Sequence, residues 1–166
     1  MKNNNKIIFL DIDGVMNSKI TSEKYFNKFI EKRYKSTFDA PMYLRVGIMN
    51  PKRIHIKWLN YIIKKTKAKI VISSAWREDF TIIGWNHFFS ALGIKGEVVG
   101  LTEHLYTERG LEIDKFLTDN KINYYVILDD DYDYALPHIK KHWVLCSNHS
   151  GLTKEKAEEA INILKK

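Results

Sequence analysis

Two groups of aspartates in this sequence have the residue type and spacing to do chemistry. Asp11 and Asp13 stand two residues apart in the segment Asp-Ile-Asp-Gly, and three consecutive aspartates occupy positions 129–131. Carboxylates gathered in a closed site repel one another, and a bound divalent cation relieves that repulsion. Hard oxygen ligands favour Mg²⁺, and Gly14 lets the backbone turn sharply and approach a ligand closely. The acidic residues therefore predict a Mg²⁺ site.

A third polar cluster, Ser73-Ser74, adds hydroxyl groups that could donate hydrogen bonds to a phosphoryl oxygen. Metal, carboxylate and hydroxyl together indicate phosphoryl transfer. Two other phosphate or metal motifs do not fit. The sequence contains no GxxxxGK[ST] segment, which excludes a P-loop enzyme, and the glycine spacing around both acidic groups differs from that of an EF-hand loop.

Each polar cluster follows a short apolar run, and such runs alternate with segments of helical periodicity. We predict strands at residues 6–10, 68–74, 97–101, 124–128 and 142–146. We predict helices at residues 18–36, 52–67, 80–92, 109–120 and 153–166. This alternation predicts a three-layer α/β sandwich with a mostly parallel sheet. Ligands of such sheets bind beyond the carboxyl ends of the strands, where all three polar clusters are expected.

Length and composition bound the class of protein. A chain of 166 residues, 45% hydrophobic and 28% charged, fits one globular domain and argues against disorder or a coiled coil. Cys146 is its one cysteine, so we expect neither a disulfide-linked partner nor a multi-cysteine zinc site. The apolar runs are too short for a signal peptide or a membrane span. We therefore expect a cytoplasmic protein without membrane contact.

The charge is unevenly distributed along the chain. Residues 1–69 contain 16 basic and 5 acidic residues, a net charge of +11, whereas residues 70–166 have a net charge of −4. Such asymmetry is typical of a half that faces nucleic acid or phosphate. The other interpretation is a solvated, lysine-rich surface, and charge alone leaves both open. We expect the four tryptophans to belong to the core rather than to stack on bases, namely Trp58, Trp76, Trp85 and Trp143.

Taken in order, the three clusters resemble the motifs of the haloacid dehalogenase-like (HAD) superfamily of phosphohydrolases. The segments FLDIDGV (9–15), VISSAW (71–76) and VILDDD (126–131) resemble its first, second and fourth motifs. The resemblance covers nearly the whole chain. More narrowly, SSAWR (73–77), ERGLEI (108–113) and GLT (151–153) resemble the small HAD domains of Swiss Army Knife RNA repair proteins.

The resemblance implies a role for each acidic residue. Asp11 would be the nucleophile that accepts the phosphoryl group, because covalent catalysis divides one difficult displacement into two. Asp13 would protonate the leaving oxygen and then deprotonate the attacking water. The Mg²⁺ ion would be bound by the Asp11 side chain, the main-chain carbonyl of Asp13, Asp129 and Asp130, the last directly or through water.

The resemblance also implies phosphate-binding groups. Ser74 best matches the hydroxyl of the second motif because it stands two residues before a tryptophan, with Ser73 as the alternative if the strand shifts by one residue. The third motif of the superfamily is usually lysine, but Arg109 stands at the matching position here. Arginine keeps the charge and binds a phosphoryl group with two donors. Lys115 is the alternative, and Arg109 would then be a surface residue.

These implications predict a Mg²⁺-dependent phosphatase acting on a phosphorylated substrate, namely a nucleotide or a polynucleotide terminal phosphate. The alternatives are a phosphatase of small metabolites and a non-catalytic nucleic-acid-binding module. An insertion at about residues 17–50 follows the first strand, where the superfamily places its cap. It is too small for a separate cap domain, so the site would be open to large substrates.

Overall fold

The computed structural model describes residues 6–18, 51–105, 107–132 and 136–165. Apart from Asn17 and Ser18, the predicted cap insertion lies outside the described residues, as does nearly all of the helix predicted at 18–36.

All the strands of the described sheet run parallel, as predicted. The sheet has the order β3-β2-β1-β4-β5. Its strands are β1 (Lys6–Leu10), β2 (Lys69–Ile72), β3 (Val98–Leu101), β4 (Tyr124–Asp129) and β5 (Trp143–Leu145). Each lies within one or two residues of the range predicted from the apolar runs.

Helices alternate with these strands. The α-helices are α3 (Arg53–Thr66), α4 (Ile82–Ala91), α5 (Arg109–Asn120) and α6 (Lys154–Lys165). Two short 3₁₀ helices, η1 (Ala75–Asp79) and η2 (Lys140–His142), follow β2 and precede β5. Within the described ranges, none of the helices has both the length and the hydropathy that crossing a membrane requires.

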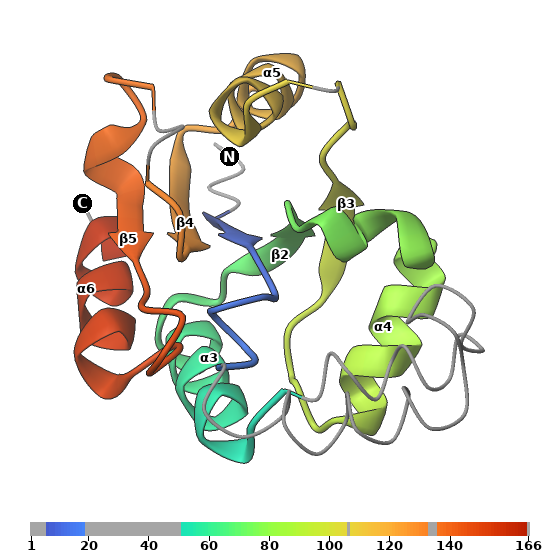
Figure 1. The fold of residues 1–166 in the computed structure, drawn as a ribbon, viewed down its shortest axis with the longest axis vertical. Helices are drawn as coiled ribbons and strands as arrows, with labels where there is room; N and C mark the ends of the chain where they lie inside the picture. Colours follow the sequence, from blue (N-terminus) through green and yellow to red (C-terminus); the bar gives the residue numbers. More distant parts are fainter. Residues whose placement is uncertain (1–5, 19–50, 106, 133–135, 166) are drawn as a thin grey trace.

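Alternation of side chains along the strands produces the layers. Ile8 and Leu10 of β1 pack in one apolar cluster with residues of α3, α4 and α6. Ile7 and Phe9 point to the other face and pack with Ile113 of α5. Figure 1 shows the same arrangement, with α5 on one side of the sheet and the other three helices on the opposite side. The fold is the predicted three-layer α/β sandwich.

Strand register aligns the predicted site residues along one edge of the sheet. Leu10 of β1 pairs with both Ile72 of β2 and Leu128 of β4. The ladder continues beyond these pairs, because Asp11 N donates to Leu128 O at 3.0 Å and Ser73 N donates to Leu10 O at 3.1 Å. The segments that follow all three strands therefore meet at the carboxyl edge of the sheet, where parallel sheets bind their ligands.

Candidate active site

Three carboxylates converge at this edge. Asp11, Asp129 and Asp130 each place a carboxylate oxygen within 4.8 Å of the others. The Asp11 residue is 3% exposed and Asp129 is 0% exposed. Burial, reinforced by the charge of Asp11, raises the pKa of Asp129 to about 7, and burial also raises the pKa of Asp11 and of Asp130. The cluster is therefore costly to ionise in the absence of a cation.

The backbone at Gly14 leaves room for this cluster. Gly14 has a φ of +70°, and a Cβ atom placed there would lie only 2.1 Å from Asp130 Oδ2. A side chain at this position would force the Asp130 carboxylate away from the loop. Three hard oxygen donors held together around a loop that only glycine permits fit a Mg²⁺ ion. Asp11, Asp129 and Asp130 are the side chains that would hold it.

Arg109, the first residue of α5, bridges two of these carboxylates. Its Nη1 lies 2.6 Å from Asp129 Oδ2 and 3.0 Å from Asp11 Oδ2. Burial disfavours the guanidinium charge, but the charges of Asp11 and Asp129 outweigh this effect and raise the pKa of Arg109. The other oxygen of Asp129 accepts a hydrogen bond from Asp131 N at 2.9 Å. Arg109 is thus an ion-pair partner of the cluster rather than a solvated surface charge.

Asp13 is exposed and lies outside the group of three carboxylates. Its side chain is held by two donors: Asn17 Nδ2 at 2.7 Å from Oδ1, and Trp76 Nε1 at 2.8 Å from Oδ2. Asn17 also accepts a hydrogen bond from Gly14 N at 3.1 Å, which fixes the turn that follows Asp13. The geometry gives Asp11 and Asp13 different surroundings although they stand only two residues apart.

The two serines have different environments. The Ser74 hydroxyl donates a hydrogen bond to Asp11, which lowers the Asp11 pKa against the larger effect of burial. Ser73 is completely buried, and its hydroxyl has no hydrogen-bond partner among the residues that the structure describes. Lys115 lies on the exposed side of α5, where it pairs with Asp119 at 2.5 Å and with Glu103 at 3.4 Å. Ser74 thus contacts Asp11, whereas Lys115 pairs elsewhere.

A buried ion pair supports the segments that carry these residues. Arg77 Nη2 donates to Glu112 Oε2 at 2.9 Å, and both side chains are nearly fully buried. Arg77 Nη1 also donates to the main-chain oxygens of Ser73 and Ser74, at 3.2 and 3.0 Å. The second Glu112 oxygen accepts from Leu105 N at 3.0 Å. The pair therefore ties the end of β2 to the segment after β3 and to α5, the helix that begins at the bridging arginine.

A cavity of about 530 Å³ opens beside the cluster, and Arg109, Asp129 and Trp143 are among the residues that line it. A hollow of this size next to an arginine and a carboxylate offers space for part of a substrate.

A family model described as the HAD domain in Swiss Army Knife RNA repair proteins matches residues 7–157. The chain belongs to this family. No curated protein and no solved structure matches it. This match confirms the resemblance to HAD domains that the motifs predicted. The family indicates activity of the hydrolase or phosphatase type.

Two residues of this HAD domain's site were missed by sequence reasoning, Asn17 and Trp76, the donors to Asp13. Trp85 and Trp143 are buried as predicted, and Trp58 and Trp76 are partly buried and pack against the core. The available signal was position, since Asn17 follows the glycine of the first motif by three residues and Trp76 follows Ser74 by two.

Proposed function

We propose that this HAD domain is a Mg²⁺-dependent phosphatase that works through an aspartyl phosphate on Asp11. The proposed substrate is a nucleotide or a polynucleotide terminal phosphate. One observation carries the proposal: a buried Asp11 that contacts Arg109 and Ser74 and belongs to a group of three carboxylates with oxygens within 4.8 Å of one another. A nucleophile, two phosphate-binding groups and a set of metal ligands meet in this arrangement.

In the first step, an oxygen of the Asp11 carboxylate attacks the phosphorus atom. A new bond forms between phosphorus and the aspartate oxygen, and the bond from phosphorus to the leaving oxygen breaks. Asp13 acts as the general acid that gives a proton to the leaving oxygen. Its exposed position, steered by the indole of Trp76 and the amide of Asn17, suits a group that must reach the substrate from the open side.

In the second step, Asp13 takes a proton from a water molecule, and the water oxygen attacks phosphorus. The bond between phosphorus and Asp11 breaks and inorganic phosphate is released. Arg109 and Ser74 donate hydrogen bonds to phosphoryl oxygens in both steps. Bound Mg²⁺ would supply the positive charge that lets an anionic carboxylate approach an anionic phosphate.

The substrate class rests on two supports. The first 69 residues have a net charge of +11, which favours an anionic partner larger than a single phosphate. The family to which the chain belongs is named for RNA repair proteins. Because a fold does not by itself give a substrate, the substrate requires its own experiment.

The test is a phosphate-release assay with Mg²⁺ on mononucleotides, on 3′- and 5′-phosphorylated oligonucleotides and on sugar phosphates. Release from oligonucleotides or nucleotides is the expected result. Release from sugar phosphates alone would replace the proposed substrate with a small metabolite. If no substrate is hydrolysed although Mg²⁺ raises the melting temperature, the domain is a non-catalytic module.

The test variant is Asp11→Asn, and its matched control is Asp119→Asn. Asparagine is nearly isosteric with aspartate but cannot form the phosphoenzyme, so Asp11→Asn should lower kcat by at least about a thousandfold. Asp119 is an exposed aspartate of α5 outside the cluster. Asp119→Asn should keep wild-type activity.

A further inference from the structure

A second hollow on the molecule is basic rather than acidic. This groove of about 750 Å³ runs between α3, the start of β2 and the segment that precedes β3. It shares no residue with the carboxylate cluster. Five lysines line it against one carboxylate, namely Lys57, Lys64, Lys67, Lys69, Lys95 and Glu97.

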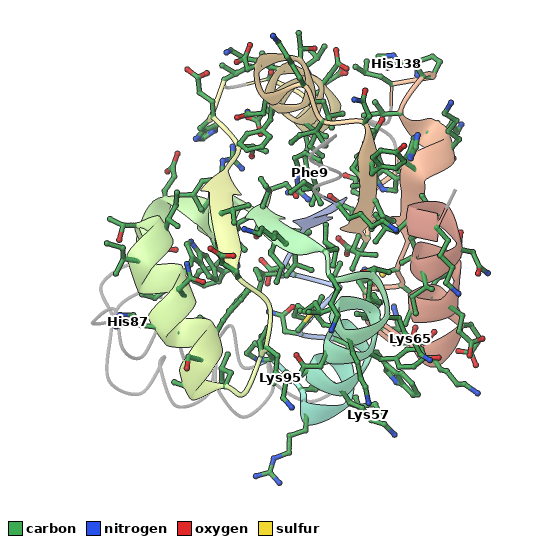
Figure 2. The ribbon with its side chains drawn as sticks, turned by 180° about the vertical axis from the view of Figure 1, so that it is seen from behind. Phe9, Lys57, Lys65, His87, Lys95 and His138 are labelled. Carbon is green, nitrogen blue, oxygen red and sulfur yellow. The ribbon has the colours of Figure 1, made fainter. Side chains whose placement is uncertain are left out.

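Most of this charge is uncompensated. Lys69 pairs with Glu97 at 2.9 Å, and this exposed pair neutralises one of the five lysines. Within the described part of the chain, Lys64, Lys67 and Lys95 form no ion pair, and all three are exposed. Figure 2 shows Lys57 and Lys95 on the side of the molecule where α3 lies. The groove therefore carries a net charge of +4. Four of its five lysines belong to the first 69 residues and account for part of the positive excess there.

The two walls of the groove are held together by the protein itself. Asn60 of α3 donates through Nδ2 to Gly93 O at 2.9 Å and accepts through Oδ1 from Lys95 N at 2.8 Å. At Gly96, an added Cβ would lie 2.6 Å from Cδ1 of Ile70 and 2.8 Å from Cδ1 of Ile63, so this segment packs closely on β2 and α3. The lysines thus project from a preformed frame, which lowers the ordering cost of binding.

Aromatic side chains lie among the lysines. Trp58 and Tyr61 both line the groove, are partly exposed, and meet edge to face with ring centroids 6.0 Å apart. Lys57 Nζ lies 4.7 Å from the centroid of the Trp58 ring. Lysines next to aromatic rings are typical of grooves that bind single-stranded nucleic acid, because the cations contact phosphates and the rings stack on bases.

The length of the groove agrees with a short stretch of single-stranded nucleic acid. Lys57 and Lys67 are ten residues apart on and just beyond α3, which corresponds to about 15 Å of helix axis. The net charge of +4 in the groove sets about four as the number of phosphate contacts along this length. We propose that this groove binds single-stranded nucleic acid through its phosphate backbone, at a site separate from the carboxylate cluster.

The experiment measures the affinity of the full chain for a fluorescently labelled single-stranded oligonucleotide with hydroxyl groups at both ends, across a series of salt concentrations. Because this probe carries no terminal phosphate, its binding does not depend on the phosphatase reaction. Four contacts predict a slope of log affinity against log salt of about −2.8, which is about a 50-fold loss between 50 and 200 mM salt. The variant Lys64→Gln/Lys67→Gln/Lys95→Gln should leave a slope of about −0.7, which is about a 3-fold loss over the same range.

The matched control removes three exposed lysines elsewhere: Lys121→Gln/Lys140→Gln/Lys141→Gln. Lys121 directly follows α5 and has a left-handed backbone conformation, with a φ of 52°. Lys67 directly follows α3 and has the same conformation, with a φ of 60°. The control should keep the wild-type slope. Equal slopes for wild type and the groove variant would overturn the proposal. An equal loss in both triple variants would also overturn it, because net charge and not the groove would then govern binding.

Discussion

Replacing Arg109 with glutamine tests how the carboxylate cluster is balanced. The arginine contacts two carboxylates through a single nitrogen, at 2.6 and 3.0 Å. Those oxygens belong to side chains that are only 4% and 0% exposed, while the arginine side chain is 24% exposed. Glutamine fills a similar volume but removes the charge, so two buried carboxylates lose their ion-pair partner.

The size of the effect follows from this burial. Removing one partner of a buried ion pair costs about 3–5 kcal/mol, and the partial exposure of the arginine puts the expected loss near the lower end, about 3 kcal/mol. In a chain of this length, a loss of that size lowers Tm by about 6–12 °C. The loss should shrink below pH 7, because Asp129, whose pKa is already raised to about 7 by burial, can then take up a proton instead of remaining an unpaired anion.

Thermal unfolding of the metal-free protein at about pH 8.5, above the raised pKa of Asp129, measures the loss directly. Lys115→Gln is the matched control, because it removes one positive charge from the exposed side of the same helix. The Lys115 side chain is 45% exposed, so solvent screens its ion pairs and the change in Tm should be small. Added Mg²⁺ should stabilise Arg109→Gln more than wild type, because the arginine no longer competes for the same oxygens.

Two results would refute this reasoning. If Arg109→Gln melts at the wild-type temperature at high pH, the ion pair contributes nothing to stability. If Mg²⁺ raises the Tm of both proteins equally, the ion and the arginine do not share the Asp11 and Asp129 oxygens.

Three further predictions concern the frame around the site. Glu112→Gln should lower the free energy of unfolding by about 3 kcal/mol, because it leaves the Arg77 charge buried and unpaired; an unchanged urea midpoint would contradict this. Gly14→Ala should abolish stabilisation by Mg²⁺, whereas Gly93→Ala, with a φ of +77° and nothing within 4 Å, should cost only the backbone strain of about 1–2 kcal/mol; equal Mg²⁺ responses would exclude a steric role. Because the raised pKa of Asp129 makes the folded state bind the extra proton, metal-free stability should fall as pH rises from about 4 to about 7, and Asp129→Asn should flatten that dependence.

The fold and the edge that carries the site could be predicted from the sequence because both depend on local patterns. Short apolar runs define the strands, and parallel strands bring their carboxyl ends together. These two patterns are enough to predict that Asp11, Ser74 and Asp129 lie at one edge of the sheet. The different environments of the two serines needed the structure: Ser73 continues the strand ladder through its hydrogen bond to Leu10 O, while Ser74 caps η1 and turns its hydroxyl to Asp11.

Long-range pairs could not be predicted, because their spacing in the sequence carries no periodic signal. Arg77 and Glu112 are 35 residues apart, yet they form a buried ion pair. The basic groove could not be predicted for the same reason, because long-range contacts, the Asn60 hydrogen bonds among them, bring Lys95 to the lysines of α3.

Detecting the phosphoenzyme tests the central claim most directly. The protein is mixed with Mg²⁺ and a substrate labelled in its terminal phosphate, quenched in acid during turnover, and examined by peptide mass spectrometry. The account predicts one phosphoryl group on the peptide that contains Asp11, labile to hydroxylamine as an acyl phosphate is, and absent from Asp11→Asn. Turnover by wild type with no acid-stable label, or a label that persists in Asp11→Asn, would contradict the assignment of Asp11 as the nucleophile.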